Sequence, residues 1–297
     1  MIGSKSREKR RAGRRNALMA YKTILTIVNS PDLSVSGLEP ALEMASREDA
    51  HLDVLCLGID RTQTGYFYAG TNAFIQQETL QKAQEEAAEI EQAVAARLGT
   101  EGVRWASEAM VAPIAGVSNL VAQRARFCDL VVMPRPYGET RGVEDEAAVE
   151  AVLFDGHAPL LVVPEGTDSG QIGRKIIVAW NQSAEALAAI RHALPLLQGA
   201  DLVNIVVVDP PQHGADRSDP GGALSQMLAR HGVRTEISVL AKTMPRVADV
   251  LARHIVDTNA DLIVMGAYGH SRFREAILGG ATRNMLESTA IPVLMAH

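Results

Sequence analysis

The chain is short of several residue types and patterns, and each shortage limits what it can be. Only 4% of its 297 residues are aromatic, so the core has to be built from Leu, Ile, Val and Ala. No apolar run approaches the roughly 20 residues needed to cross a bilayer, and no apolar segment of the kind found in secretory signals lies near the first residue. We therefore expect a globular protein of the cytoplasm that has no membrane partner.

Cysteine is scarce too, with Cys56 and Cys128 the two in the chain. Their spacing fits no zinc motif, and each lies in or just before an apolar run that predicts a buried strand. We interpret both as inert thiols in a reducing compartment and predict no metal site. Two catalytic patterns are missing as well, the Gly-x-Ser-x-Gly nucleophile elbow and the lysine-bearing phosphate loop.

The net charge of −6 conceals an uneven distribution. Residues 1–18 contain seven Lys or Arg and one Glu, a balance of +6, which leaves −12 on the remainder. A body this acidic is expected not to bind nucleic acid. Because Met19 also reads as a natural start before the first strand, we predict that residues 1–18 are a disordered basic extension without a function of their own.

Three sequence landmarks occur twice in the same order, which predicts a tandem duplication. The pairs are residues 22–30 and 174–183, residues 128–133 and 260–265, and residues 158–164 and 290–296. Residues 164–173 are rich in turn formers and read as the linker. We therefore expect one domain over 19–166 and a second over 173–297.

In each half, continuous Val/Ile/Leu runs alternate with helical patterns, which indicates parallel strands covered on both faces. In the first half the expected strands are 22–28, 52–59, 103–109, 129–133 and 159–163, and the expected helices are 36–48, 75–98, 114–127 and 144–154. In the second half the strands are expected near 175–180, 202–208, 234–240, 261–265 and 292–296, and the helices near 183–197, 220–231, 245–258 and 281–288. The predicted fold is α/β, with two tandem doubly wound domains, each a five-stranded parallel sheet with helices on both faces.

The most informative segment is 261–282, with the sequence DLIVMGAYGHSRFREAILGGAT. An apolar strand runs into Gly266, Gly269 permits a turn with positive φ, and a glycine pair opens the last helix. Open α/β sheets bind ligands beyond the carboxyl ends of their strands, and the free N–H groups at a helix N-terminus suit a phosphate. Thr282 can add a hydroxyl or cap that helix. The alternative is a loop that only turns the chain.

The spacing of Gly266, Gly269 and Gly279 resembles the ATP-binding pattern of the universal stress protein family, and the resemblance extends over both halves. That pattern is Gly, two residues, Gly, nine residues, Gly, then Ser or Thr, and here Gly280 stands at the hydroxyl position. The resemblance implies adenine contacts from Asn181, at the place of the family's Asp, and from a valine on the second strand. The implied nucleotide-binding residues are Asn181, Val207, Met265, Gly266, Gly269, Gly279, Gly280, Ala281 and Thr282.

The first half departs much further from this pattern. Pro134 stands where Gly266 stands, and Pro136 follows it, so two N–H groups that a phosphate would use are missing. Four acidic residues add negative charge around the same loop, namely Glu139, Glu144, Asp145 and Glu146. Because like charges repel, we predict that this half does not bind ATP and serves as a structural or docking partner.

The resemblance implies an ATP-binding stress-response or regulatory module, with Mg²⁺ a companion of the phosphates. Two alternatives stay open, namely an interaction protein of the same fold without a nucleotide, and a slow ATPase. No general base is evident beside the loop, so any hydrolysis should be slow. Asp209 is either a contact for a cation or a turn residue before a proline pair.

The resemblance also bears on assembly, because family members often pair through their last strand. Strands 159–163 and 292–296 are therefore expected to lie side by side, which would make the chain an internal pseudo-dimer. A homodimer of whole chains is compatible with the sequence as well.

Overall fold

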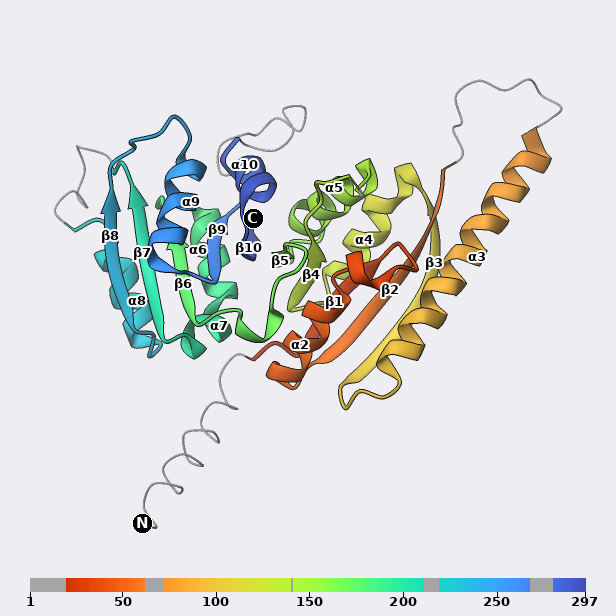
Figure 1. The fold of residues 1–297 in the computed structure, drawn as a ribbon, viewed down its shortest axis with the longest axis horizontal. Coiled ribbons are helices and arrows are strands. Elements are labelled where there is room, and N and C mark those ends of the chain that lie inside the picture. Colours follow the sequence, from red (N-terminus) through yellow and green to blue (C-terminus); the bar gives the residue numbers. More distant parts are fainter. Residues whose placement is uncertain (1–19, 62–71, 140, 211–218, 268–279) are drawn as a thin grey trace, which may run out of the picture.

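The structure, a computed structural model, describes residues 20–61, 72–139, 141–210, 219–267 and 280–297 (Figure 1). The described residues form ten strands in one sheet, in the order β3-β2-β1-β4-β5-β10-β9-β6-β7-β8. Neighbouring strands are parallel everywhere except between β5 and β10, which are antiparallel. The predicted α/β class with parallel sheets under helices is confirmed.

Each half contributes five strands and the helices between them. The strands of the amino-terminal half are β1 (Thr23–Val28), β2 (His51–Asp60), β3 (Arg104–Pro113), β4 (Leu130–Pro134) and β5 (Leu160–Val163). Its helices are α2 (Leu38–Glu48), α3 (Asn72–Leu98), α4 (Val117–Ala125) and α5 (Val143–Glu150), with a π-helical turn η3 (Ala151–Asp155) after α5. The strands of the carboxy-terminal half are β6 (Lys175–Ala179), β7 (Leu202–Val208), β8 (Thr235–Leu240), β9 (Leu262–Gly266) and β10 (Val293–Ala296). Its helices are α6 (Ala184–His192), α7 (Leu194–Gly199), α8 (Gly222–Arg230), α9 (Val247–Thr258) and α10 (Gly280–Ser288).

The two halves repeat one topology and meet at the centre of the sheet. The strand order is β3-β2-β1-β4-β5 in the first half and β8-β7-β6-β9-β10 in the second, which is the same order element for element. At the junction Leu294 of β10 lies opposite Leu161 of β5 in an antiparallel register. The expectation that strands 159–163 and 292–296 lie side by side is therefore confirmed, and the two five-stranded units fuse into one continuous sheet.

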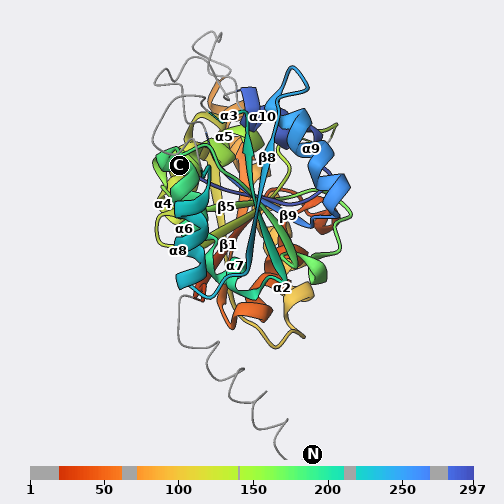
Figure 2. The same cartoon turned by 90° about the vertical axis from the view of Figure 1, so that its left-hand side faces the viewer.

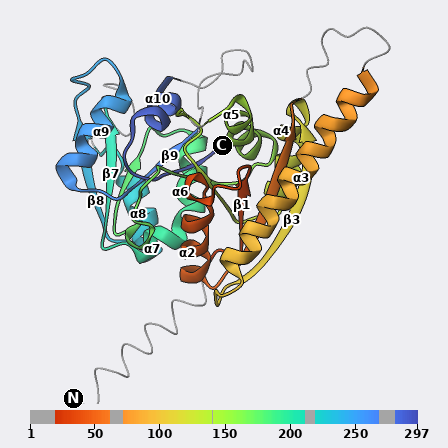
Figure 3. The same ribbon diagram turned by 45° about the vertical axis from the view of Figure 1, so that its right-hand side comes forward.

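Helices cover both faces of the sheet, and the helices on each face come from both halves of the chain. One buried cluster packs helices α2, α3, α6, α7 and α8 on the sheet. The other packs α4, α5, η3, α9 and α10 on the opposite face. Figure 2 looks along the strongly twisted sheet, with helices on either side of it. The longest helix, α3, lies across β2 and β3 at one end of the sheet (Figure 3). None of the described helices is long and apolar enough to cross a membrane.

Two predicted elements differ from the structure for identifiable reasons. The helix expected over 183–197 is two helices, α6 and α7, and Pro195 lies at the start of the second. A proline inside a continuous helix would lose a hydrogen bond and clash with the carbonyl four residues before it. The strand expected over 103–109 continues to Pro113, because β2 is long enough to pair with all ten residues of β3.

Candidate functional site

The predicted residues of the carboxy-terminal half lie where three neighbouring strands end. β9, β6 and β7 are adjacent and parallel, so their carboxyl ends meet at one edge of the sheet. From β6 the chain continues to β7 on one side, whereas the later strand β9 lies on the other side of β6. The boundary between β6 and β9 is therefore the topological switch point. Four predicted residues belong to this edge, namely Asn181, Val207, Met265 and Gly266.

Asn181 begins the turn that leads from β6 into α6. Its Oδ1 accepts a hydrogen bond from the backbone N–H of Ser183 at 3.1 Å. Ser183 caps α6 by accepting from the N–H of Ala186, also at 3.1 Å. Gln182, between them, has a φ of 65°. Because such a turn uses one side-chain oxygen, Asn fills the structural role of the Asp expected here and removes its charge from an exposed position.

Val207 and Met265 are both buried, with exposed fractions of 5% and 7%. Met265 packs in the cluster under α9 and α10. Val207 faces the other way, toward Gly221 at the start of α8, where a Cβ would lie 3.7 Å from its Cγ2. Their side chains therefore lie on opposite faces of the sheet. Both residues can therefore contact one ligand through their backbone groups at the strand ends.

Gly266 ends β9 as predicted, and the structure gives it a packing role. A Cβ at this position would lie 2.5 Å from the backbone nitrogen of Ala186 and 2.8 Å from the carbonyl carbon of Glu185. Only a residue without a side chain allows the first turn of α6 to lie this close to the end of β9. The amino-terminal half makes the matching contact between the start of α2 and the end of β4, but there the glycine belongs to the helix start. A Cβ added at Gly37, before α2, would lie 3.2 Å from the Cα of Met133.

Helix α10 presents its first residues to solvent at the same edge. Gly280 and Ala281 are exposed, whereas Thr282 is 4% exposed and lies on the buried side of the helix with Met285. Among the described residues, a Cβ on Gly280 would meet only Asn284 Nδ2, at 3.9 Å. The first turn of a helix carries N–H groups without intrahelical partners. Over the described residues, the start of α10 therefore offers backbone donors that no side chain crowds.

Two cations flank this helix start. Arg246, which precedes α9, donates from Nη1 to Asn284 Oδ1 of α10 at 3.2 Å. The side chain of Arg283 is exposed, and its Nε contacts Glu287 Oε1 at 2.7 Å. Arg246 was not predicted from the sequence, because it lies far from the glycine segment in the chain. Its place just after β8 was the signal, since loops after strands gather at this edge.

The other predicted residues lie outside the part of the chain that the structure describes. They are Gly269 and Gly279 of the glycine pattern. Their contribution to the site stays a prediction from the sequence.

In the amino-terminal half, the equivalent edge is filled by its own acidic side chains. Asp145, in the first turn of α5, accepts from Asn29 Nδ2 at 3.2 Å and from the N–H of Gly142 at 2.8 Å. Glu144, whose side chain is 7% exposed, pairs with Arg61 Nη1 at 2.5 Å. These carboxylates occupy the helix N-terminus that an anion would use. The cavity left beside Asn29 and Asp145 measures about 10 Å³, room for a single water at most.

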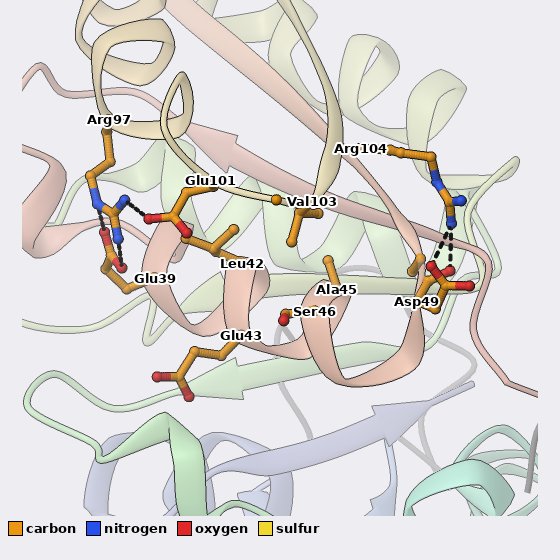
Figure 4. A pocket seen from close by; sticks show the side chains of 12 residues that line it. Glu39, Leu42, Glu43, Ala45, Ser46, Asp49, Arg97, Glu101, Val103 and Arg104 are labelled. Carbon is orange, nitrogen blue, oxygen red and sulfur yellow. Dashed lines mark hydrogen bonds and ion pairs between the residues drawn. The ribbon is translucent and has the colours of Figure 1, made fainter. Parts of the chain in front are cut away.

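A larger groove of about 460 Å³ lies at the opposite edge, near the amino ends of β2 and β3 (Figure 4). Its arginines are already paired. Arg97 contacts Glu39 at 2.6 Å and Glu101 at 2.5 Å, and Arg104 contacts Asp49 Oδ1 at 3.0 Å. The groove therefore offers an incoming anion no cation that lacks a carboxylate partner. Over the described residues, no group of three or more His, Cys, Asp or Glu is arranged to hold a metal ion.

Comparisons with known proteins agree with this architecture. The universal stress protein family matches residues 173–297. A curated universal stress protein from Synechocystis sp. is 29% identical over 157 residues, which are 50% of each chain, so this chain spans about half the length of that relative. The crystal structure of a universal stress protein from Archaeoglobus fulgidus covers 94% of this chain and 96% of its own, with a TM-score of 0.70 and 15% identity. A universal stress protein structure from Pseudomonas aeruginosa covers 95% of this chain and 94% of its own, with a TM-score of 0.57 and 18% identity.

The two structural likenesses extend over both halves and concern the fold. The fold is thus that of a tandem α/β protein, with the candidate site at the carboxyl ends of its strands. Residues 173–297 are thus a domain of the universal stress protein family, and the first half repeats the same fold.

Proposed function

We propose that the protein binds an adenine nucleotide, ATP, in its carboxy-terminal half and acts as a regulatory module of a stress response. The observation that carries the proposal is the exposed start of α10, which follows β9, with no atom of the described residues closer than 3.9 Å to a Cβ added at Gly280. Backbone N–H groups and a positive helix end at that place suit a phosphate chain. The predicted spacing of Gly266, Gly269 and Gly279 supplies the same kind of donor over the preceding loop.

The residues present fit a nucleotide better than they fit a protein-held metal. The adenine would lie near Asn181 and the ends of β7 and β9, with the phosphates at Gly280 and Ala281. Asp209 has a φ of 50°, and its N–H bonds to the carbonyl of Leu240, which agrees with its interpretation as a turn residue. A Mg²⁺ ion bound with ATP would take its oxygens chiefly from phosphates and water. It would lower the repulsion between the phosphates.

The amino-terminal half is proposed to bind no nucleotide. Its equivalent edge is occupied by Glu144 and Asp145, and the remaining cavity of about 10 Å³ is far too small for a base or a phosphate. One ATP per chain is therefore the expected stoichiometry. Nucleotide binding would bias a conformation or a partner. No general base is assigned, so turnover is expected to be slow or absent.

Isothermal titration of the full chain with ATP tests the proposal. The wild type should bind one equivalent, and Gly269→Val should lose affinity at least about tenfold (1.4 kcal/mol), because a branched side chain disfavours positive φ and blocks a close backbone approach. Gly199→Val is the matched control. Gly199 lies at the end of α7, at the opposite edge of the sheet, and a Cβ there meets nothing within 4 Å.

Three results separate the candidate functions. Equal binding by the wild type and Gly269→Val would remove the loop from the site. Absence of binding in the wild type would favour an interaction protein of the same fold. Phosphate release by the wild type, lost in Gly269→Val, would make it a slow ATPase.

A further inference from the structure

Two residues of the amino-terminal half contact the helix that begins at the proposed phosphate site. Tyr137 follows β4, and the guanidinium carbon of Arg283 lies over its ring, 5.4 Å from the centroid. Arg135 donates from Nη1 to the backbone carbonyl of Glu287 at 3.3 Å. Arg283 and Glu287 both belong to α10. Figure 1 places α5 and α10 on the same side of the sheet, on either side of the junction between the halves.

A third residue of the amino-terminal half is linked to the end of β9. Phe154, in η3, meets the His297 ring edge-on, with centroids 4.7 Å apart and planes at 72°. His297 Nδ1 lies 3.0 Å from the carbonyl oxygen of Ala267, and since a carbonyl only accepts, Nδ1 carries the proton. Ala267 directly follows Gly266, and its N–H bonds to the carbonyl of Ala296 at 2.9 Å.

These contacts converge on the two described elements that carry the candidate site. One set holds α10 and the other holds the backbone just after β9. Arginine over an aromatic face and edge-on aromatic pairs are each modest in energy, but they fix direction as well as distance. A ligand held by backbone N–H groups gains affinity when those groups are already in place before it binds.

We infer that the amino-terminal half is a brace for the nucleotide site of the other half, with Tyr137 and Phe154 as its positioning residues. The inference rests on the proposed function. It also assigns a role to a half whose own ligand edge is closed by Glu144 and Asp145. The segment after β4, with Arg135 and Tyr137, contacts α10.

The chemistry of Tyr137 sharpens the inference. Its hydroxyl is buried and has no hydrogen-bond partner among the described residues. Burial, together with the charge of Glu146, raises the pKa of Tyr137, so the group is a neutral phenol at every pH of interest. What the site uses is therefore the ring face, and phenylalanine should serve as well as tyrosine. Arg283 is held over that face by its contact with Glu287.

Titration of full-length variants with ATP tests the brace. Tyr137→Ala and Phe154→Ala should each weaken ATP binding at least fivefold, whereas Tyr137→Phe should stay within twofold of the wild type. Phe127→Ala is the matched control, because Phe127 is an aromatic residue just after α4 that is 80% exposed. Circular dichroism of each variant should match the wild type, so that affinity is compared between folded proteins.

Several outcomes would overturn the inference. Wild-type affinity in both Tyr137→Ala and Phe154→Ala would do so. So would a loss in Arg283→Met without a loss in Tyr137→Ala, since Arg283 would then act on the phosphate directly. Equal losses in Tyr137→Phe and Tyr137→Ala would also contradict it.

The brace can be tested even if the wild type fails to bind ATP, which would sink the proposed function alone. Hydrogen exchange should then be at least fivefold faster at Ala267 in Phe154→Ala, and at the amides of residues 284–288 in Tyr137→Ala. Exchange in β1 and β2 should be unchanged. Wild-type exchange at both places would show that the amino-terminal half does not hold them.

Discussion

Asp129 and Asp261 hold the same place in the two halves of the chain. Each comes just before the fourth strand of its half and accepts hydrogen bonds from the backbone where the first strand begins. Asp129 Oδ2 accepts from the N–H groups of Lys22 and Thr23 at 2.7 and 3.0 Å. The Asp261 carboxylate accepts from those of residues 173–175 at 2.8 to 3.1 Å. An equivalent aspartate therefore connects the first and fourth strands in each half, β1 with β4 and β6 with β9.

Removing these carboxylates should destabilise the fold without touching the nucleotide edge. We expect Asp129→Ala to lower the free energy of unfolding by about 1 kcal/mol and Asp261→Ala by about 2 kcal/mol, because bonds to charged acceptors are worth more than neutral ones and Asp261 accepts more of them. Urea unfolding followed by circular dichroism measures both. Asp201→Ala, at an exposed aspartate outside this arrangement, is the control. Losses no larger than that of the control would contradict the assignment.

Gly58, near the carboxyl end of β2, sets how closely α3 lies on the sheet. A Cβ there would be 2.0 Å from the carbonyl oxygen of Ala83, so α3 has to move away if any side chain is added. We expect Gly58→Ala to lower the free energy of unfolding by about 1–3 kcal/mol, as overpacking in cores does. Gly102→Ala is the matched control, because a Cβ at Gly102 meets nothing within 4 Å. Thermal unfolding of the two variants would show equal stability if α3 were free to shift.

Much of this fold could be predicted because its elements differ in hydrophobic period. The buried strands are unbroken apolar runs, while α3 carries Ala83, Ala87, Ile90 and Val94 at helical spacing, all buried in the structure. The resemblance to a family whose members often pair through their last strand also placed β5 beside β10. The break between α6 and α7 was missed, although Pro195 marks it, because the apolar period continues through the proline.

The site was less predictable, because it depends on which side chains fold back onto the backbone. The acidic residues after β4 were expected to repel a phosphate. The structure shows that Asp145 and Glu144 do more, since they bond to Gly142, Asn29 and Arg61 and fill the space. Gly266 was assigned to the ligand loop, and it is also required for contact with α6. Neither contact leaves a pattern in the sequence, because the partners come from distant elements.

The two cysteines should be poor nucleophiles in the folded protein. Burial, assisted by Glu91, raises the pKa of Cys56 from 9.0 to about 12, and burial, assisted by Asp53, does the same for Cys128. At pH 8 the thiolate fraction then falls from about one in ten to about one in ten thousand. A thiol reagent should modify native Cys56, which is fully buried, only as fast as the protein opens. Modification of the native Cys128→Ser variant at the rate of a free thiol would contradict this.

The same pKa values predict a loss of stability in alkali. Because the pKa of each thiol is raised, the folded state keeps protons that the unfolded state releases above pH 9. The stability that the two thiols contribute is therefore complete below pH 9 and is lost as the pH rises toward 12. Urea unfolding between pH 8 and 10.5 should show a steeper decline in the wild type than in a variant with both cysteines replaced by alanine. Parallel declines would assign the alkaline sensitivity to other groups.

Gly280 stands where the family's pattern carries a hydroxyl, and the described residues leave room for one. Among them, the nearest atom to an added Cβ is Asn284 Nδ2 at 3.9 Å, an ordinary contact. Gly280→Ser should therefore fold normally and bind ATP at least twofold more tightly, because its hydroxyl adds a donor beside the exposed N–H groups of α10. Gly280→Ala separates this effect from the gain in helix stability, about 1 kcal/mol at most, that follows when a helical glycine is replaced by a residue with a side chain. Isothermal titration of the full-length variants should rank Ser above Ala and Ala near the wild type. If Ser and Ala bind alike, position 280 does not face the phosphates, and the start of α10 would have to be turned away from the nucleotide.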